Sequence, residues 1–270
     1  MRMSSEIVGI VNLTADSFSD GGKYLSHELA VRWSLELVES GASIIDLGAE
    51  SSHPDSEKVS VREEIDRLCP VVVSLKAEGI RVSVDTYKPD VMKAVLELGV
   101  DMINDITALG DSSAHSVVAE YDVPVVIMHS RSRDARAERG VWHCEDYMGS
   151  VMDYFRERIA WLESEGIRKE RLIVDPGMGF FLGDNVEASL SVLRDLYRLK
   201  ELGHKLYVST SRKSFIGKVL DHPVTLRGDG TLATELWAAL QGVDYIRTHN
   251  VKALRDGILM LSAIQNGGLE

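Results

Sequence analysis

Short apolar runs alternate with amphipathic stretches from one end of the chain to the other. Runs such as "SIIDLG", "VVIMH" and "LIVD" are almost continuously apolar, which is typical of strands covered on both faces in a parallel sheet. Between them, stretches such as "PDVMKAVLELG" repeat apolar residues at helical spacing and end in glycine. The pattern predicts strands at Glu6–Leu13, Ala42–Gly48, Arg81–Asp85, Asp101–Ile106, Pro124–His129, Arg171–Asp175, Lys205–Thr210 and Asp244–His249.

Strands that each precede a helical stretch, repeated eight times, predict a (β/α)8 TIM barrel of the α/β class. The chain has 270 residues, which lies within the usual size of one such barrel, so we expect a single domain over residues 1–270. A doubly wound open sheet is the alternative that the same alternation allows.

Charge and composition narrow the partners and the compartment. The formal net charge of −12 argues against nucleic-acid binding through bulk electrostatics, but a few local cations would suffice to hold a small anionic substrate. No apolar stretch is long enough for a membrane span, and the N-terminus lacks the apolar segment of a signal peptide. Cys69 and Cys144 lie far apart and form no metal or redox motif. We therefore expect a cytoplasmic protein without a membrane partner.

Almost every predicted strand ends in a polar side chain. In a TIM barrel the C-terminal strand ends carry the active site. A single such residue commonly caps the next helix, but many polar groups around one mouth cost free energy unless a ligand satisfies them. We therefore expect a ligand site formed by Asn12, Asp46, Glu50, Asp85, Asn104, Asp105, His129, Asp175, Ser211, Arg212, Lys213, Arg247 and His249.

The residue types at these strand ends suggest two halves of a ligand. Carboxylate and amide groups at Asp85, Asn104 and Asp175 suit a flat heterocycle with an N–H edge. The last two strands, where barrels commonly bind phosphate, contribute cationic groups at Lys213, Arg247 and His249. A heterocycle that carries a phosphate or pyrophosphate fits both.

Asp105 is assigned a structural or supporting role, and surface positions are expected for His27, His115, His143, His204 and His222.

Nine motifs make the chain resemble a dihydropteroate synthase over almost its whole length. They are "GIVNLTADSFSDGG", "IIDLGAESSHPD", "VSVDTYKPDV", "INDI", "VIMHS", "IVDPGMGF", "STSRKSFIGK", "GTLATELWAALQG" and "YIRTHNVK". The resemblance implies a (β/α)8 barrel that condenses 6-hydroxymethyl-7,8-dihydropterin pyrophosphate with p-aminobenzoate in folate biosynthesis. It also implies Mg²⁺ as cofactor and a homodimer.

The resemblance implies a role for each matching residue. The pterin is bound by Asp85, Asn104, Ile106, Met128, Asp175, Phe180, Lys213 and Arg247. The p-aminobenzoate lies near Phe18, Ser52, Phe181 and Ser211. Pyrophosphate is held by Asn12, His53, Arg247 and His249, and Asn12 also helps to coordinate Mg²⁺. The residues implied in catalysis are Asp20, Lys213, Arg247 and His249.

The polar run "NLTADSFSDGG", at Asn12–Gly22, resembles the family's first loop, which closes over the substrates. The implied reaction is dissociative: pyrophosphate leaves first, and the aniline nitrogen attacks a resonance-stabilised pterin cation. Such a cation must be kept from water, so the chemistry requires a lid. Asp20 would bring a carboxylate near the positive charge, and Phe18 would shape the aniline site.

The chain departs from the family pattern at three places. Ala15 replaces a common proline, and the second loop has Ser52-His53-Pro54-Asp55 in place of Thr-Arg-Pro-Gly. Phe181 replaces a common glycine after "DPGMGF". The stretches "SSHPD", "MHS" and "DPGMGFFLG" most resemble the sulfonamide-insensitive branch of the family. We interpret Phe181 as a wedge that admits p-aminobenzoate and clashes with larger sulfonamides, against the alternative that Phe181 packs inward and touches no ligand.

Two other functions remain open at this point. A methyltetrahydrofolate–corrinoid methyltransferase would share the pterin-binding barrel but would not need "SRKSF" or the pair Arg247 and His249. A synthase-like protein that binds pterin without catalysis would be consistent with the altered second loop.

Overall fold

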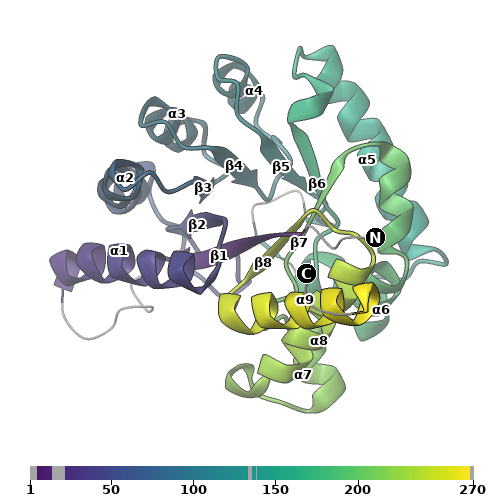
Figure 1. Ribbon diagram of the computed structural model, residues 1–270. Helices are drawn as coiled ribbons and strands as arrows, with labels where there is room; N and C mark the ends of the chain where they lie inside the picture. The colour runs from purple at the N-terminus through teal and green to yellow at the C-terminus, as the bar shows by residue number, and fades with distance from the viewer. Residues whose placement is uncertain (1–4, 14–21, 133–135, 138, 268–270) are drawn as a thin grey trace.

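A computed structural model describes residues 5–13, 22–132, 136, 137 and 139–267. Its strands form one closed parallel barrel in which each strand pairs with its neighbours in chain order, and β8 pairs with β1 (Figure 1). The strands are β1 Glu6–Asn12, β2 Ile44–Gly48, β3 Val82–Asp85, β4 Met102–Asp105, β5 Val125–Met128, β6 Leu172–Asp175, β7 Lys205–Val208 and β8 Tyr245–Thr248. Every predicted strand is present and the (β/α)8 class is confirmed, so the open-sheet alternative is wrong.

Helices surround the barrel and follow each strand, with two between β7 and β8 (Figure 1). The α-helices are α1 Gly22–Ser40, α2 Val61–Ala77, α3 Pro89–Glu97, α4 Ser112–Ala119, α5 Tyr147–Ser164, α6 Val186–Arg194, α7 Ser214–Leu220, α8 Gly228–Leu240 and α9 Val251–Asn266. Short 3-10 helices are η2 Lys169–Arg171, η3 Gly179–Leu182, η4 Leu196–Leu202 and η5 Val224–Leu226. Several helices begin where the sequence offers a cap, because Ser60, Asp111, Asp146 and Asn250 accept hydrogen bonds from first-turn amides.

The core has two layers, which explains the continuously apolar strands. One buried cluster fills the barrel interior and comprises Val8, Ile44, Met102, Val126, Ile173, Tyr207 and Tyr245. The larger cluster lies between the strands and the helices. Ile44 belongs to the first cluster and its neighbour Ile45 to the second, as alternation along a strand requires. Asp46 follows at the next inward position, so the interior leads directly into the polar mouth.

One surface prediction is wrong. His115 is buried at 5% exposure, because its Nε2 lies 2.8 Å from the Leu109 carbonyl oxygen and its ring lies edge-on to Trp161. A partner for the imidazole makes this inward position of α4 acceptable. His143 and His222 are exposed as expected, and His27 and His204 are partly buried.

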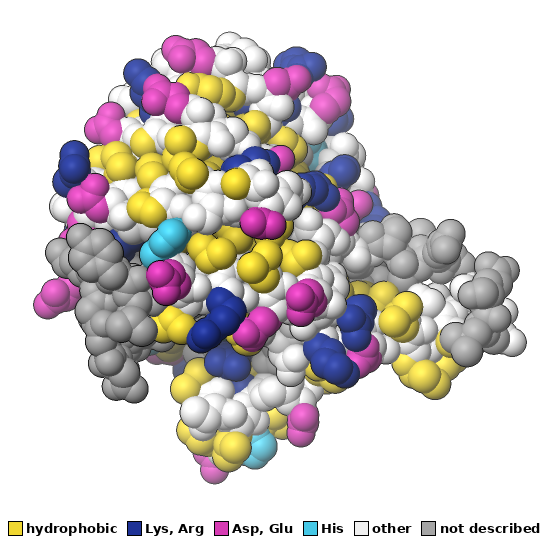
Figure 2. Space-filling model, turned by 60° about the vertical axis from the view of Figure 1, so that its left-hand side comes forward, with side chains coloured by type: hydrophobic (Ala, Val, Ile, Leu, Met, Phe, Trp, Pro, Cys, Tyr) yellow, Lys and Arg dark blue, Asp and Glu magenta, His cyan; other side chains and the backbone are white. Residues whose placement is uncertain are grey.

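The molecular surface carries both signs of charge. Figure 2 shows acidic and basic side chains interspersed with small apolar areas on one face. Within the described ranges, none of the helices is long and apolar enough to cross a membrane. Cys69 and Cys144 are both free thiols.

Candidate active site at the C-terminal mouth of the barrel

A buried ion-pair network forms the floor of the mouth. The Arg247 guanidinium donates from Nε to Asp46 Oδ2 at 2.6 Å and from Nη2 to Asp85 Oδ2 at 3.2 Å. Asn104 Nδ2 donates to the same Asp46 oxygen at 3.3 Å. Asp46 is fully buried and its other oxygen, Oδ1, has no hydrogen-bond partner. The polar side chains predicted at the strand ends therefore meet in one network, which joins β2, β3, β4 and β8.

The floor holds carboxyl groups whose pKa values are raised. Desolvation raises the pKa of Asp85 to about 7, against the opposing effect of Arg247 and with a further increase from Asp46. Desolvation also raises the pKa of Asp175 to about 6, and the Gly177 amide, which donates to its Oδ1 at 2.9 Å, partly offsets this. A ligand that donates N–H groups to these oxygens would stabilise the carboxylate forms.

The opposite side of the mouth is cationic but strongly desolvated. Burial and the neighbouring Arg247 lower the pKa of Lys213 to about 8. Burial, with Arg247, Arg212 and Lys213 nearby, lowers the pKa of His249 to about 3, so its imidazole is neutral near pH 7. His249 Nδ1 lies 2.8 Å from Ser211 Oγ, which also accepts from the His249 amide at 3.2 Å. An arriving anion would meet Lys213 and Arg247 as charges and His249 as a neutral group.

A cavity of about 540 Å³ opens beside this mouth, between the segments that follow β2, β5, β6 and β7 and the segment that joins α7 to α8. Four predicted residues line it together with Lys213, namely Ser52, His53, Phe180 and Phe181. The other lining residues are Ser51, Pro54, Ala137, Met178, Arg212, Ser214, Val224 and Arg227. The cavity is large enough for a small aromatic acid.

Phe181 packs into the wall of this cavity. Its side chain is 5% exposed and clusters with Met128 and Ala137, and its ring lies 4.9 Å from Lys213 Nζ. Phe180 is less buried and lies edge-on to His53, with 5.8 Å between the ring centroids. Phe181 therefore belongs both to this apolar cluster and to the lining of the cavity, and its contact with a ligand stays a prediction.

Arg212, Ser214 and Arg227 line the cavity although the resemblance implied no role for them. Ser214 is the first residue of α7. Arg212 has a left-handed backbone conformation, with a φ of 58°, in the turn between β7 and α7. The motif "SRKS" at a strand–helix junction was a usable signal for both. Arg227 donates from Nη1 to the Arg212 carbonyl oxygen at 2.9 Å from a distant segment, and the sequence pattern gave no sign of this contact.

The other predicted residues fall into three groups. Asn12 ends β1 with an exposed side chain, and Ile106 packs against the cluster of Met128 and Phe181. Asp105 has a structural role, since it accepts from the Thr107 and Leu109 amides and the Thr107 hydroxyl. Phe18, Asp20 and most of the proposed lid lie outside the described residues.

The negative charge of Asp55 in the second loop is balanced by a cation from the segment that follows β5. Asp55, which stands where the family commonly has glycine, forms an ion pair with Arg139. It also lies 3.7 Å from His53 Nδ1. The added negative charge is therefore offset locally, at the rim of the cavity.

A barrel with this mouth belongs to the class of pterin-binding enzymes, since the family model described as "Pterin binding enzyme" matches residues 8–249. The chain is 46% identical to the dihydropteroate synthase type-3 of Escherichia coli, over 96% of this chain and 99% of that protein. Two solved structures of the Xanthomonas albilineans dihydropteroate synthase are also similar. The complex with 4-aminobenzoic acid has a TM-score of 0.89 at 40% identity and covers 97% of this chain and 93% of that one. The complex with 7,8-dihydropteroate has a TM-score of 0.85 at 38% identity and covers 97% and 94%.

The chain belongs to the dihydropteroate synthase family. The expected transferase activity, which makes dihydropteroate in folate biosynthesis, is thereby confirmed. The methyltransferase alternative finds no support among these relatives.

Proposed function

We propose that the floor of the mouth binds the pterin ring of 6-hydroxymethyl-7,8-dihydropterin pyrophosphate through Asp85, Asn104 and Asp175. The observation that carries this proposal is the convergence of two carboxyl groups and an amide from the ends of β3, β4 and β6 on one mouth. Their raised pKa values agree with it. A pterin offers N–H donors to such oxygens, and binding would favour their ionised forms. Apolar contacts to the ring would come from Ile106, Met128 and Phe180.

We assign to Lys213 and Arg247 the stabilisation of negative charge on the leaving pyrophosphate. Both cations lie at the mouth, and Arg247 is held there by two carboxylates. As the bond to pyrophosphate lengthens, these groups would stabilise the developing negative charge. His249 would bind as a neutral hydrogen-bonding group, because its low pKa leaves it uncharged. His53, on an exposed part of the second loop, would contribute less.

The family implies Mg²⁺, and the donor set at the mouth fits an ion carried mainly by the substrate. Asn12 ends β1 with an exposed amide, an oxygen ligand that Mg²⁺ accepts. Within the described residues, no group of three His, Cys, Asp or Glu side chains could hold a metal by itself. Mg²⁺ commonly keeps several waters and binds through phosphates and one or two protein oxygens, which matches a single Asn12 ligand. When bound, the ion would supply positive charge to the pyrophosphate.

The cavity of Lys213, Ser52 and Phe181 is assigned to p-aminobenzoate. Its aniline end would face the pterin and its carboxylate the Arg212–Ser214 turn. Phe181 is expected to limit the space for anything longer than the substrate. We propose on this basis that the enzyme is poorly inhibited by sulfonamides, since they extend beyond the length of p-aminobenzoate. The wall position of Phe181 against Lys213 supports this proposal.

Pyrophosphate release tests the proposed function. The two substrates and Mg²⁺ are mixed with the enzyme, and pyrophosphate is measured with each component omitted in turn. Release that requires both substrates supports the synthase. Pterin binding without release would identify a non-catalytic pterin-binding protein, and methyl transfer from methyltetrahydrofolate to a corrinoid would identify the methyltransferase.

A homodimer and a cytoplasmic location remain proposals. Large apolar side chains are exposed on the adjoining helices α8 and α9, at Trp237, Leu240, Leu259, Met260 and Ile264. Such side chains would be buried in an interface between two copies. Light scattering during gel filtration would give the mass, and a monomer at micromolar concentration would contradict the dimer.

A further inference from the structure

The second loop, Glu50–Ser60, forms one wall of the substrate cavity. It connects β2 to α2, and its residues Ser51, Ser52, His53 and Pro54 line the cavity. A wall made by a loop is useful only if the ends of the loop are held in place, because each loosely held residue would lose conformational entropy when a ligand binds.

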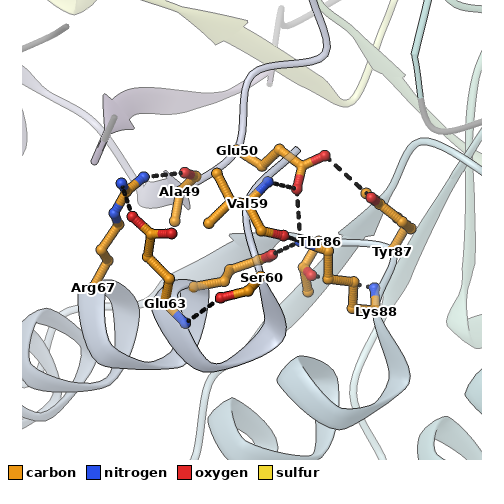
Figure 3. A network of polar contacts seen from close by, with 10 residues as sticks. Ala49, Glu50, Val59, Ser60, Glu63, Arg67, Thr86, Tyr87 and Lys88 are labelled. Atoms are coloured by element: carbon orange, nitrogen blue, oxygen red, sulfur yellow. Dashed lines mark hydrogen bonds and ion pairs between the residues drawn. The ribbon is translucent and has the colours of Figure 1, made fainter. Parts of the chain in front are cut away.

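One ammonium group binds both ends of this loop. Lys88 Nζ donates to Glu50 Oε2 and to the Val59 carbonyl oxygen, each at 2.6 Å (Figure 3). The same nitrogen donates to Glu64 Oε2 in α2 at 2.6 Å. Lys88 itself precedes α3, so the contact ties the loop to the end of the neighbouring strand, β3. We call Lys88, Glu50, Val59 and Glu64 the clasp.

Glu50 completes the clasp by binding the far end of its own loop. Its Oε2 also accepts from the Val59 amide at 3.0 Å, and its Oε1 accepts from the Tyr87 hydroxyl at 3.1 Å (Figure 3). The clasp is shielded from water, since the side chains of Lys88, Glu50 and Glu64 are 11%, 8% and 1% exposed. Burial alone would raise the pKa of Glu50, but hydrogen bonds from Lys88 and Val59 hold it below its ordinary value.

The clasp adjoins the pterin floor as well as the loop. Glu50 and Glu64 line a small pocket together with Asp85, Ser52 and Ile106. Two carboxylates share one ammonium there, so the loss of that ammonium would leave uncompensated charge beside Asp85, whose pKa Glu64 already raises. Near its start the loop has a second support, because the Ser52 carbonyl oxygen accepts from the Ala137 amide at 3.2 Å.

We propose that Lys88 is a positioning residue for the p-aminobenzoate site, which sets the cavity wall by holding both ends of the loop Glu50–Ser60. The inference rests on the proposed assignment of the cavity to p-aminobenzoate. Lys88 lines neither the p-aminobenzoate cavity nor the small pocket beside Asp85, and its effect passes through the placement of Ser52 and His53.

The test compares Lys88→Met with Lys76→Met in the full-length enzyme. Lys76 Nζ donates to Asp101 Oδ2 at the same 2.6 Å but lies at the end of α2 away from the loop. Lys76→Met therefore removes a similar ion pair and leaves the clasp intact. We expect Lys88→Met to raise the KM for p-aminobenzoate about tenfold or more, with kcat changed less than threefold. The uncompensated Glu64 also raises the pKa of Asp85, so the KM for the pterin substrate should rise as well, but it should return to the wild-type value when Glu64→Gln is added. Hydrogen exchange of residues 50–60 should rise in this variant only.

A double variant separates positioning from stability. Lys88→Met with Glu64→Gln removes both the ammonium and one uncompensated carboxylate, so it should recover thermal stability while the KM for p-aminobenzoate stays high. Recovery of the KM together with stability, or an unchanged KM in folded Lys88→Met, would overturn the inference alone. No pyrophosphate release by the wild type would overturn the proposed function and the inference with it.

Discussion

Arg247 and Asp46 form a charge-assisted hydrogen bond of 2.6 Å between residues that are 201 positions apart in the chain. Asp46 is fully buried, and Arg247 is its cationic partner. The pair links β2 to β8, the two strands that flank β1, at the mouth of the barrel. It also fixes the orientation of the guanidinium at the mouth, because Nε donates to Asp46 and Nη2 donates to Asp85.

The first prediction concerns charge at the pyrophosphate. Arg247→Ala should weaken binding of the pterin pyrophosphate by roughly tenfold or more, because a charged hydrogen-bond donor is lost. It should also lower the free energy of unfolding by about 3–5 kcal/mol, since Asp46 would remain buried without its cation. His53→Ala should change both quantities only slightly. Calorimetry with pyrophosphate gives the binding term, and unchanged binding in folded Arg247→Ala would move the anion site elsewhere.

The second prediction concerns the pterin floor. Asp175→Asn keeps the shape of the side chain but turns one acceptor into a donor that faces a donor. We expect a loss of about 2–4 kcal/mol in kcat/KM for the pterin substrate. Near wild-type activity would rule out the assignment.

Stability provides the control for this variant. The folded-state pKa of Asp175 is raised from 3.8 to about 6, so the folded state binds more protons than the unfolded state in this window. Ionisation of Asp175 therefore lowers the free energy of unfolding as the pH rises from about 4 to 6, and the loss persists above pH 6. Asp175→Asn should lack this loss. Urea denaturation at pH 5 and pH 7 would separate an inactive folded variant from an unfolded one.

The alternation of strands and helices, and the polar strand ends at Asp85 and Asp175, could be predicted because both are local patterns in the sequence. The partner of Asp46 could not, since Arg247 reaches it only after the barrel closes. The contacts of Arg227 and Lys88 could not be predicted either. Both depend on the conformation of loops, and the hydrophobic periodicity of the sequence does not specify loop conformation. His115 was misassigned because a polar residue on a short helix is usually exposed, and its buried partner is a backbone carbonyl six residues away.

The third prediction concerns the pH profile of kcat/KM, which reports groups in the free enzyme. Binding the pterin N–H edge requires ionised Asp85 and Asp175, whose pKa values are about 7 and about 6, so activity should rise from pH 5 to an optimum between the pKa of Asp85 and that of Lys213. The charge on the leaving pyrophosphate requires protonated Lys213, whose pKa is about 8, so activity should fall above that value. Lys213→Arg should move the alkaline fall to higher pH. A flat profile from pH 5 to 9 would contradict these assignments.

The last prediction concerns Phe181 and sulfonamides. Sulfonamides share the aniline end of p-aminobenzoate but carry a further ring, so a side chain at the far wall can repel the drug while it admits the substrate. Phe181 is positioned for this by its packing against Met128 and Ala137 and by the ring contact with Lys213. A clash of about 3–4 kcal/mol would separate the affinities for drug and substrate by two to three orders of magnitude.

Phe181→Gly should therefore lower the sulfonamide inhibition constant by roughly 100-fold, with a much smaller change in the KM for p-aminobenzoate. Leu182→Gly is the matched control, because Leu182 is buried in the same 3-10 helix, η3, but does not line the cavity. Since Phe181 is buried, its removal also leaves a void, and thermal stability must be measured beside inhibition. Strong inhibition of the wild type near the KM of p-aminobenzoate would exclude sulfonamide insensitivity. Weak inhibition that persists in Phe181→Gly would leave insensitivity standing and assign it to another part of the cavity, such as the His53 loop.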